Sequence, residues 1–116
     1  GSSCFYFGGA DRTLKVYEEV LKCTVSGDGQ KAWEAVSLTL EGAPGCISRT
    51  GCSSTLVGDK AMYIFAGQDP QTGTLFNDVM KVDLQSMTLR RVDVKGGSPP
   101  PRHSHASVRL NDTCFL

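Results

Sequence analysis

Short apolar runs, separated by glycine, proline and polar turn residues, set the pattern of this sequence. The clearest runs are rich in β-branched or aromatic residues, which is typical of β-strands. They are Cys4–Phe7, Met62–Phe65, Val79–Leu84, Arg90–Val94 and Ser104–Leu110. Turn sequences such as Gly58-Asp59 and Asp69-Pro70 lie between the runs. The pattern therefore predicts an all-β fold.

One segment, Thr13–Cys23, also has apolar residues at helical spacing. Its Val16, Tyr17 and Val20 are poor helix formers, so the segment is equally well interpreted as a loop that enters a strand. The 13 glycines of the chain argue against helices in general, because each glycine destabilises a helix by roughly 1 kcal/mol. No apolar run approaches the roughly 20 residues that cross a bilayer, so we expect no membrane partner.

Four blocks of sequence recur in the same order along the chain. Cys4–Gly9 aligns with Met62–Gly67, and Glu18–Lys22 aligns with Asn77–Lys81. The two later pairs of blocks are Gly42–Arg49 with Gly97–Arg102, and Leu56–Asp59 with Arg109–Asp112. Recurrence in register indicates an internal repeat of about 50 to 60 residues, and we expect each repeat to hold four strands.

Together the repeats carry the order Pro-x-x-Arg-x-x-His, a hairpin, an aromatic strand that ends in a glycine doublet, Asn-Asp-Val and a distant Trp. The segments that carry this order are Pro99–His105, Tyr63–Gly67, Gly8-Gly9, Asn77–Val79 and Trp33. The order resembles the Kelch repeat, which implies a β-propeller with one four-stranded antiparallel blade per repeat. The sequence departs from that pattern at Ala66, which replaces the first glycine of a doublet, and at Leu89, which replaces the Trp.

The resemblance implies about two blades in this chain. We interpret residues 1–3 as a tag remnant, 4–48 as a Kelch blade that lacks its first strand, 49–101 as a complete blade and 102–116 as the start of a third. The side chains that we expect to stack the blades are Phe5, Phe7, Trp33, Tyr63, Phe65 and Val92. Because a propeller needs four to eight blades, we expect the remaining blades in a longer protein or on further copies of the chain, and no isolated monomer.

The charge balance narrows the class of partner. Twelve basic and twelve acidic side chains cancel, so the overall charge does not favour a nucleic acid.

The five cysteines are odd in number and contain no Cys-x-x-Cys pair, so we expect free thiols in a reducing compartment, the cytoplasm. No motif in the chain calls for a cofactor.

The two histidines are the strongest candidates for metal binding or catalysis. His103 and His105 alternate with Ser104 on the predicted strand, whose other face has Ala106 and Val108, so both rings project to one side. Two ligands without a third rarely bind a metal, and the Kelch resemblance implies a hydrogen-bonding role where blades meet. The chain also lacks a nucleophile elbow, so we expect no metal site, no catalytic residue and no enzyme activity.

The long loops are the best candidates for binding. In antiparallel blades the loops between strands b and c and between strands d and a emerge on one side, and long loops on a rigid scaffold often bind. These loops are Gly8–Val16, Gly42–Thr50, Gly67–Phe76 and Gly96–Arg102. The candidate partner-binding residues are Asp11, Arg12, Arg49, Gln68, Asp69, Gln71 and Arg102. For Arg49 and Arg102 there is an equal alternative to partner binding, in which each arginine pairs with other groups inside the molecule.

Two functions remain open at this point. The Kelch resemblance implies an interaction scaffold that presents these loops to a protein or peptide partner. The alternative is a non-catalytic part of a Kelch-containing enzyme whose active-site residues lie outside this chain.

Overall fold

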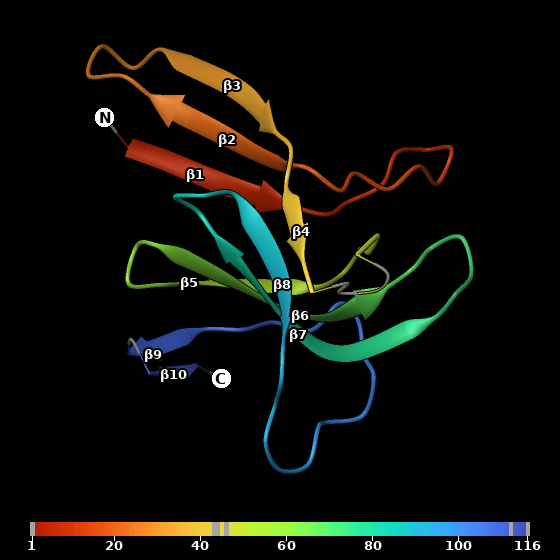
Figure 1. Cartoon of the computed structure of the whole chain (residues 1–116). Helices are drawn as coiled ribbons and strands as arrows, with labels where there is room; N and C mark the ends of the chain where they lie inside the picture. The colour runs from red at the N-terminus through yellow and green to blue at the C-terminus, as the bar shows by residue number, and fades with distance from the viewer. Residues whose placement is uncertain (1, 43–44, 46, 112, 116) are drawn as a thin grey trace.

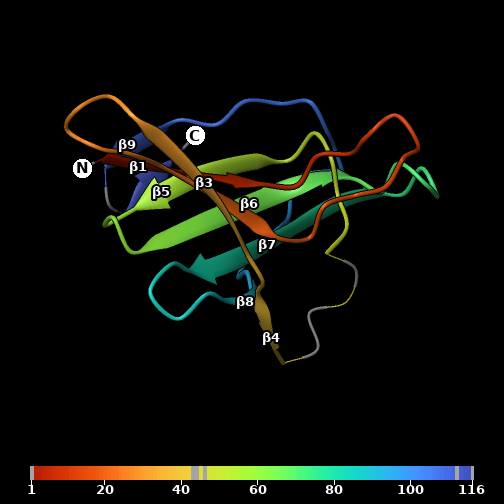
Figure 2. The same ribbon diagram turned by 90° about the horizontal axis from the view of Figure 1, so that it is seen from above.

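The computed structural model describes residues 2–42, 45, 47–111 and 113–115. Every regular element in these residues is a β-strand, and the strands form three sheets. The sheets lie one above another in chain order, with the N-terminal sheet at the top in Figure 1 and crossing over the central sheet in Figure 2. The fold is all-β, as the sequence predicts, and the described residues contain no helix long and apolar enough to cross a membrane.

The first sheet has the order β1-β2-β3 and is antiparallel. Its strands are β1 (Ser2–Phe7), β2 (Val20–Val25) and β3 (Lys31–Val36). β1 begins at Ser2, two residues before the predicted strand, and Ser2 pairs with Val25. The segment before Val20 is a loop, so the interpretation of Thr13–Cys23 as a loop that enters a strand is confirmed and the helix is excluded.

The second sheet has five strands in the order β4-β8-β7-β6-β5. They are β4 (Thr39–Glu41), β5 (Ser53–Val57), β6 (Ala61–Gln68), β7 (Leu75–Asp83) and β8 (Thr88–Val92). Strands β5 to β8 are antiparallel neighbours, whereas β4 pairs in parallel with β8. The sequence does not predict β4, because this strand has three exposed residues of which only Leu40 is apolar. The division of the chain into blades at the proposed boundaries stays a prediction.

The core lies between the first and second sheets. Met62, Ile64 and Ala66 point to this side of β6 and are buried, whereas Tyr63 and Phe65 point to the other side and are half-buried. The core residues that the other elements contribute are Val20, Ile47, Met80, Val82 and Leu89, with Phe5 and Phe7 packed against them. The core therefore fixes the two sheets against each other.

The third sheet corrects the prediction of a strand over Ser104–Leu110. Its strands are β9 (Arg109–Asn111) and β10 (Cys114–Phe115), so most of the predicted strand forms no ladder. The predicted apolar face is exposed at Val108 (55%) and Leu110 (61%). The reason lies in β5, whose buried hydroxyls need polar partners: Ser107 Oγ hydrogen-bonds Thr55 Oγ1 at 2.8 Å. Asp112 and Leu116, in the segment predicted to start a third blade, lie outside the described residues.

Candidate functional site

The loops that follow β1 and β6 project from the same end of the two sheets (Figure 1). Gln71 of the second loop donates a hydrogen bond from Nε2 to the carbonyl oxygen of Leu14 in the first, at 3.3 Å. Leu14 has a φ of 64°, which is unfavourable for a branched side chain, and its side chain is half exposed. The two loops therefore meet in space, and an exposed apolar side chain lies at their junction.

Asp11 organises the first loop. Its Oδ1 accepts hydrogen bonds from the backbone N–H of Thr13 at 2.8 Å, from Thr13 Oγ1 at 2.6 Å and from the N–H of Lys15 at 3.1 Å. These bonds, the one from the Thr13 hydroxyl above all, hold the pKa of Asp11 below its usual value. Arg12 at the tip of the same loop is exposed. Asp11 thus shapes the loop, and Arg12 is presented to solvent.

Acidification should loosen this loop. Because the folded pKa of Asp11 is depressed, the hydrogen bonds are present at neutral pH and are lost as the pH falls through that pKa, below the ordinary value of 3.8. A pH titration by NMR should place the Asp11 carboxyl below 3.8 and shift the Thr13 and Lys15 amides at the same midpoint. A midpoint at or above 3.8 would show that the loop does not hold the carboxylate.

The second loop is shaped by Gln68 and Asp69. Asp69 Oδ1 accepts the N–H of Gln71 at 2.9 Å, and the backbone carbonyl of Asp69 accepts the N–H of Gly73 at 2.8 Å. Gln68 Nε2 donates to the Gly73 carbonyl at 3.4 Å. Gln68 and Asp69 are half-buried and Gln71 is exposed. Gln68 and Asp69 therefore stabilise the conformation of the loop, whereas Gln71 faces outward.

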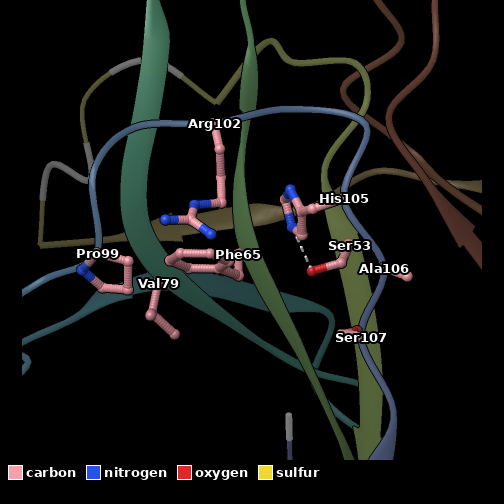
Figure 3. Close-up of a pocket in the computed structure, with 8 residues that line it drawn as sticks. All are labelled: Ser53, Phe65, Val79, Pro99, Arg102, His105, Ala106 and Ser107. Carbon is pink, nitrogen blue, oxygen red and sulfur yellow. Dashed lines mark hydrogen bonds between the residues drawn. The ribbon is translucent and has the colours of Figure 1, made fainter.

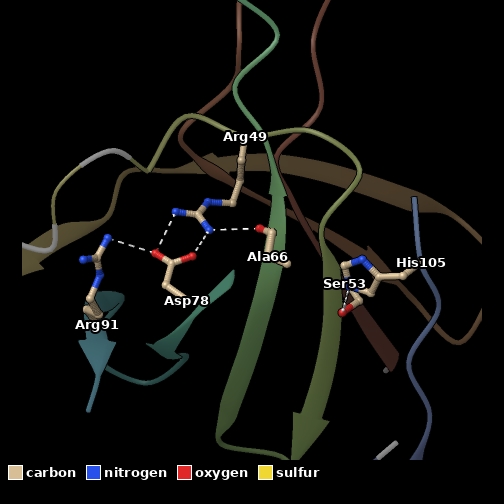
Figure 4. A network of polar contacts seen from close by, with 6 residues as sticks. All are labelled: Arg49, Ser53, Ala66, Asp78, Arg91 and His105. Carbon is tan, nitrogen blue, oxygen red and sulfur yellow. Dashed lines mark hydrogen bonds and ion pairs between the residues drawn. The ribbon is translucent and has the colours of Figure 1, made fainter. Parts of the chain in front are cut away.

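Arg49 lies inside the molecule, fully buried (Figure 4). Its Nη1 donates to Asp78 Oδ1 at 2.6 Å and to the carbonyl oxygen of Ala66 at 2.9 Å, and its Nη2 donates to Asp78 Oδ2 at 3.2 Å. The guanidinium also lies 4.3 Å from the ring centroid of Phe76. Asp78 in turn accepts a bond from the exposed Arg91 at 3.0 Å. Arg49 thus makes the internal pairing that the sequence left open as an alternative.

Arg102 is exposed, unlike Arg49. It borders a cavity of about 350 Å³ whose apolar wall includes Phe65, Val79 and Pro99 (Figure 3). Its Nε donates to the carbonyl oxygen of Pro100 at 3.1 Å. Through this bond the side chain holds its own loop, while the guanidinium remains accessible from solvent.

The backbones of Arg49 and Arg102 make equivalent contacts in the two repeats. The N–H of Gly9 donates to the Arg49 carbonyl oxygen at 3.4 Å, and the N–H of Gly67 donates to the Arg102 carbonyl oxygen at 2.9 Å. In both repeats, the glycine after the aromatic strand is therefore tied to the backbone of the recurring arginine. Residues 43, 44 and 46 of the loop before Arg49 lie outside the described residues.

The two histidines are held apart by separate hydrogen bonds. His103 Nδ1 pairs with Ser104 Oγ at 2.8 Å, and His105 Nε2 pairs with Ser53 Oγ on β5 at 2.8 Å. The φ of 56° at Ser104 interrupts the alternation that would place both rings on one side. The His105 ring also packs edge-on against Phe65, with centroids 5.2 Å apart. Within the described ranges, no three His, Cys, Asp or Glu side chains gather to hold a metal ion.

Three residues of this end of the molecule were missed by sequence reasoning. Asp78 lies in a recurring block of the sequence, and the recurring arginine has the opposite charge. These two features could have predicted the ion pair between Arg49 and Asp78. Arg91, which shares Asp78, and Leu14, at the junction of the loops, carry no comparable sequence signal.

Comparison with known proteins agrees with the repeat. A family model described as the KLHDC2/KLHL20/DRC7 Kelch-repeats domain matches residues 1–116. The chain is 48% identical to acyl-CoA-binding domain-containing protein 5 of Arabidopsis thaliana over 62 residues, 53% of this chain and 9% of that protein. It is 37% identical to dynein regulatory complex subunit 7 of Chlamydomonas reinhardtii over 90 residues, 61% of this chain and 8% of that protein. It is 33% identical to Kelch domain-containing protein 3 of Homo sapiens over 81 residues, 70% of this chain and 20% of that protein. The chain thus spans a fifth or less of the length of these three relatives.

Proposed function

This chain belongs to the Kelch-repeat family, and on that premise we propose that it is an interaction scaffold whose loops after β1 and β6 receive a protein or peptide partner. Kelch-repeat domains are generally protein–protein interaction modules and are usually non-catalytic. The proposal places the chain in the cytoplasm, with the remaining blades either in a longer parent protein or on further copies of the chain. It includes no nucleic acid, no membrane and no cofactor.

The hydrogen bond between Gln71 and Leu14 carries the proposal. It joins loops from two neighbouring repeats, so that one partner can contact both at once. The exposed Leu14 supplies an apolar contact, and Arg12 and Gln71 supply a polar rim around it. The bonds of Asp11 and Asp69 fix the loops in advance, which lowers the entropy lost on binding. Arg102 adds an accessible cation in a neighbouring loop, whereas the buried Arg49 acts only as support.

Charge reversal in the loops should abolish partner capture without affecting the fold. The test compares the full-length parent with a variant that carries Arg12→Glu and Arg102→Glu, and with the control Lys60→Glu. Lys60 is exposed in the turn between β5 and β6, at the opposite end of the sheet (Figure 1). Quantitative mass spectrometry of captured proteins should show the same partners for the parent and the control, and their loss from the loop variant.

The stability of each variant separates a binding role from a structural one. Because both arginines are exposed, the free energy of unfolding of the variant, obtained from thermal melting, should remain within about 0.5 kcal/mol of that of the parent. Equal capture by the loop variant and the control would overturn the assignment of the partner to these loops. A loss of stability in the loop variant would instead assign the arginines to internal pairing.

A further inference from the structure

The loops after β1 and β6 share one hydrogen-bond pattern, and both place a residue near the tip in the left-handed backbone region. In the first loop the N–H of Leu14 donates to the carbonyl oxygen of Asp11 at 3.0 Å. In the second loop the N–H of Gly73 donates to the carbonyl oxygen of Asp69 at 2.8 Å. The φ angles are 64° at Leu14 and 74° at Gly73. These two residues are therefore equivalent, as the alignment of the blocks that follow the loops also requires.

Leucine is an unfavourable residue for this position. In the left-handed region the Cβ of an L-residue lies too close to the following carbonyl oxygen, and a branched side chain makes the conformation rarer still. Glycine has no Cβ, which is why loops of this kind normally have it at such a position. Gly73 meets the requirement without strain. The first loop therefore keeps a strained leucine where glycine would give the more stable backbone.

Burial does not compensate for this strain. The Leu14 side chain is 50% exposed, although the loop of the following repeat is in place and binds the Leu14 carbonyl oxygen through Gln71. Gly73 shows the same position with the preceding repeat in place. It is exposed, and a Cβ built on it meets no atom within 4 Å. A neighbouring repeat on either side thus leaves this position open, so the exposure of Leu14 belongs to its place in the repeat.

We propose that Leu14 is the apolar anchor of the two loops and inserts into an apolar pocket of a protein partner, an inference that rests on the function proposed above. Single exposed leucines are ordinary on protein surfaces, but a strained one is not. Backbone strain that the fold does not need is concentrated at functional sites. The hydrogen bonds of Asp11 and Gln71 hold the leucine in place before binding, so little entropy is lost when it is inserted.

The charges beside Leu14 define the rim of the partner's pocket. Arg12 and Lys15 flank the leucine in the chain, and both are exposed. The Asp11 carboxylate accepts hydrogen bonds from Thr13 and Lys15 of its own loop. The charge that the tip of the loop presents outward around Leu14 is therefore positive. It complements an apolar pocket that is bordered by acidic side chains.

Leu14→Gly in the intact protein tests the anchor. The probe is the most abundant protein that the parent captures, identified by mass spectrometry and purified. Isothermal titration calorimetry should show a Kd about 30-fold higher or more for Leu14→Gly, as for the loss of a central apolar contact. The thermal midpoint of this variant should be no lower than that of the parent, because glycine is unstrained here.

Leu14→Met is the matched control, because it keeps an apolar side chain of similar size in the same strained backbone. It should retain most of the affinity. Lys15→Glu tests the rim and should raise the Kd, because it places a like charge opposite acidic groups. A Kd that falls in Lys15→Glu would overturn the acidic rim.

The pattern across the variants separates this inference from the proposed function. If Leu14→Gly binds as the parent does while Arg12→Glu with Arg102→Glu weakens binding, the anchor is overturned and the scaffold stands. If neither change weakens binding, both are overturned. A lower thermal midpoint in Leu14→Gly would assign the leucine to the fold, and equal losses of affinity in Leu14→Gly and Leu14→Met would exclude an apolar anchor.

Discussion

Asp78→Asn should destabilise the fold by about 3–5 kcal/mol, because it leaves the buried Arg49 without its counter-charge. The amide keeps the shape of the carboxylate, so the loss reports charge and hydrogen bonding and not a cavity. Removing one member of a buried ion pair is costly because the remaining charge is not solvated. Urea unfolding followed by circular dichroism measures the change in the free energy of unfolding.

Arg91→Ala is the matched control for this prediction. Arg91 bonds the same carboxylate at 3.0 Å, but its side chain is 48% exposed. Water therefore replaces most of the interaction, and the expected loss is at most about 1 kcal/mol. Equal losses in Asp78→Asn and Arg91→Ala would contradict the view that the Arg49–Asp78 pair is the energetic centre of this network.

The strands that the sequence predicts well are those whose burial alternates. β6 buries Met62 and Ile64 on one face, so its apolar pattern follows directly from its position between two layers. β4 has no such pattern, because it adds to the edge of the sheet by backbone bonds alone. The prediction for the segment from Ser104 to Leu110 was wrong because it assumed that the apolar residues of this segment turn inward. Hydrogen bonds to the hydroxyls on β5 instead turn the face of His105 and Ser107 inward.

The candidate site is predictable only as far as local sequence determines it. Loop position and turn chemistry place Asp11 and Asp69 correctly within their turns, because their bonds reach residues two to four positions away. The burial of Arg49 depends on Asp78, which lies 29 residues further along the chain. The contact between Leu14 and Gln71 spans 57 residues. Such contacts follow from how the sheets stack, which a single sequence does not specify.

Gly8→Ala should destabilise the fold by about 2–5 kcal/mol, from two sources that add. Gly8 has a φ of +79°, where an alanine costs about 1–2 kcal/mol. A Cβ at this position would also lie 2.8 Å from the carbonyl oxygen of Arg49, a backbone atom that cannot rotate away. Relieving that overlap moves β1 away from the start of the next repeat, at a cost of about 1–3 kcal/mol.

Gly9→Ala separates the two sources. Gly9 has a φ of +93°, but a Cβ there meets no atom within 4 Å, so only the conformational cost of about 1–2 kcal/mol applies. Urea unfolding of both variants should therefore give a clearly larger loss for Gly8→Ala. Equal losses would mean that the doublet is required only for its left-handed turn. A larger loss at Gly8 would identify close approach of neighbouring repeats as the reason that the first position of the doublet excludes a side chain here. At the equivalent position of the next doublet Ala66 is accommodated, with its methyl group buried and a φ of 59°.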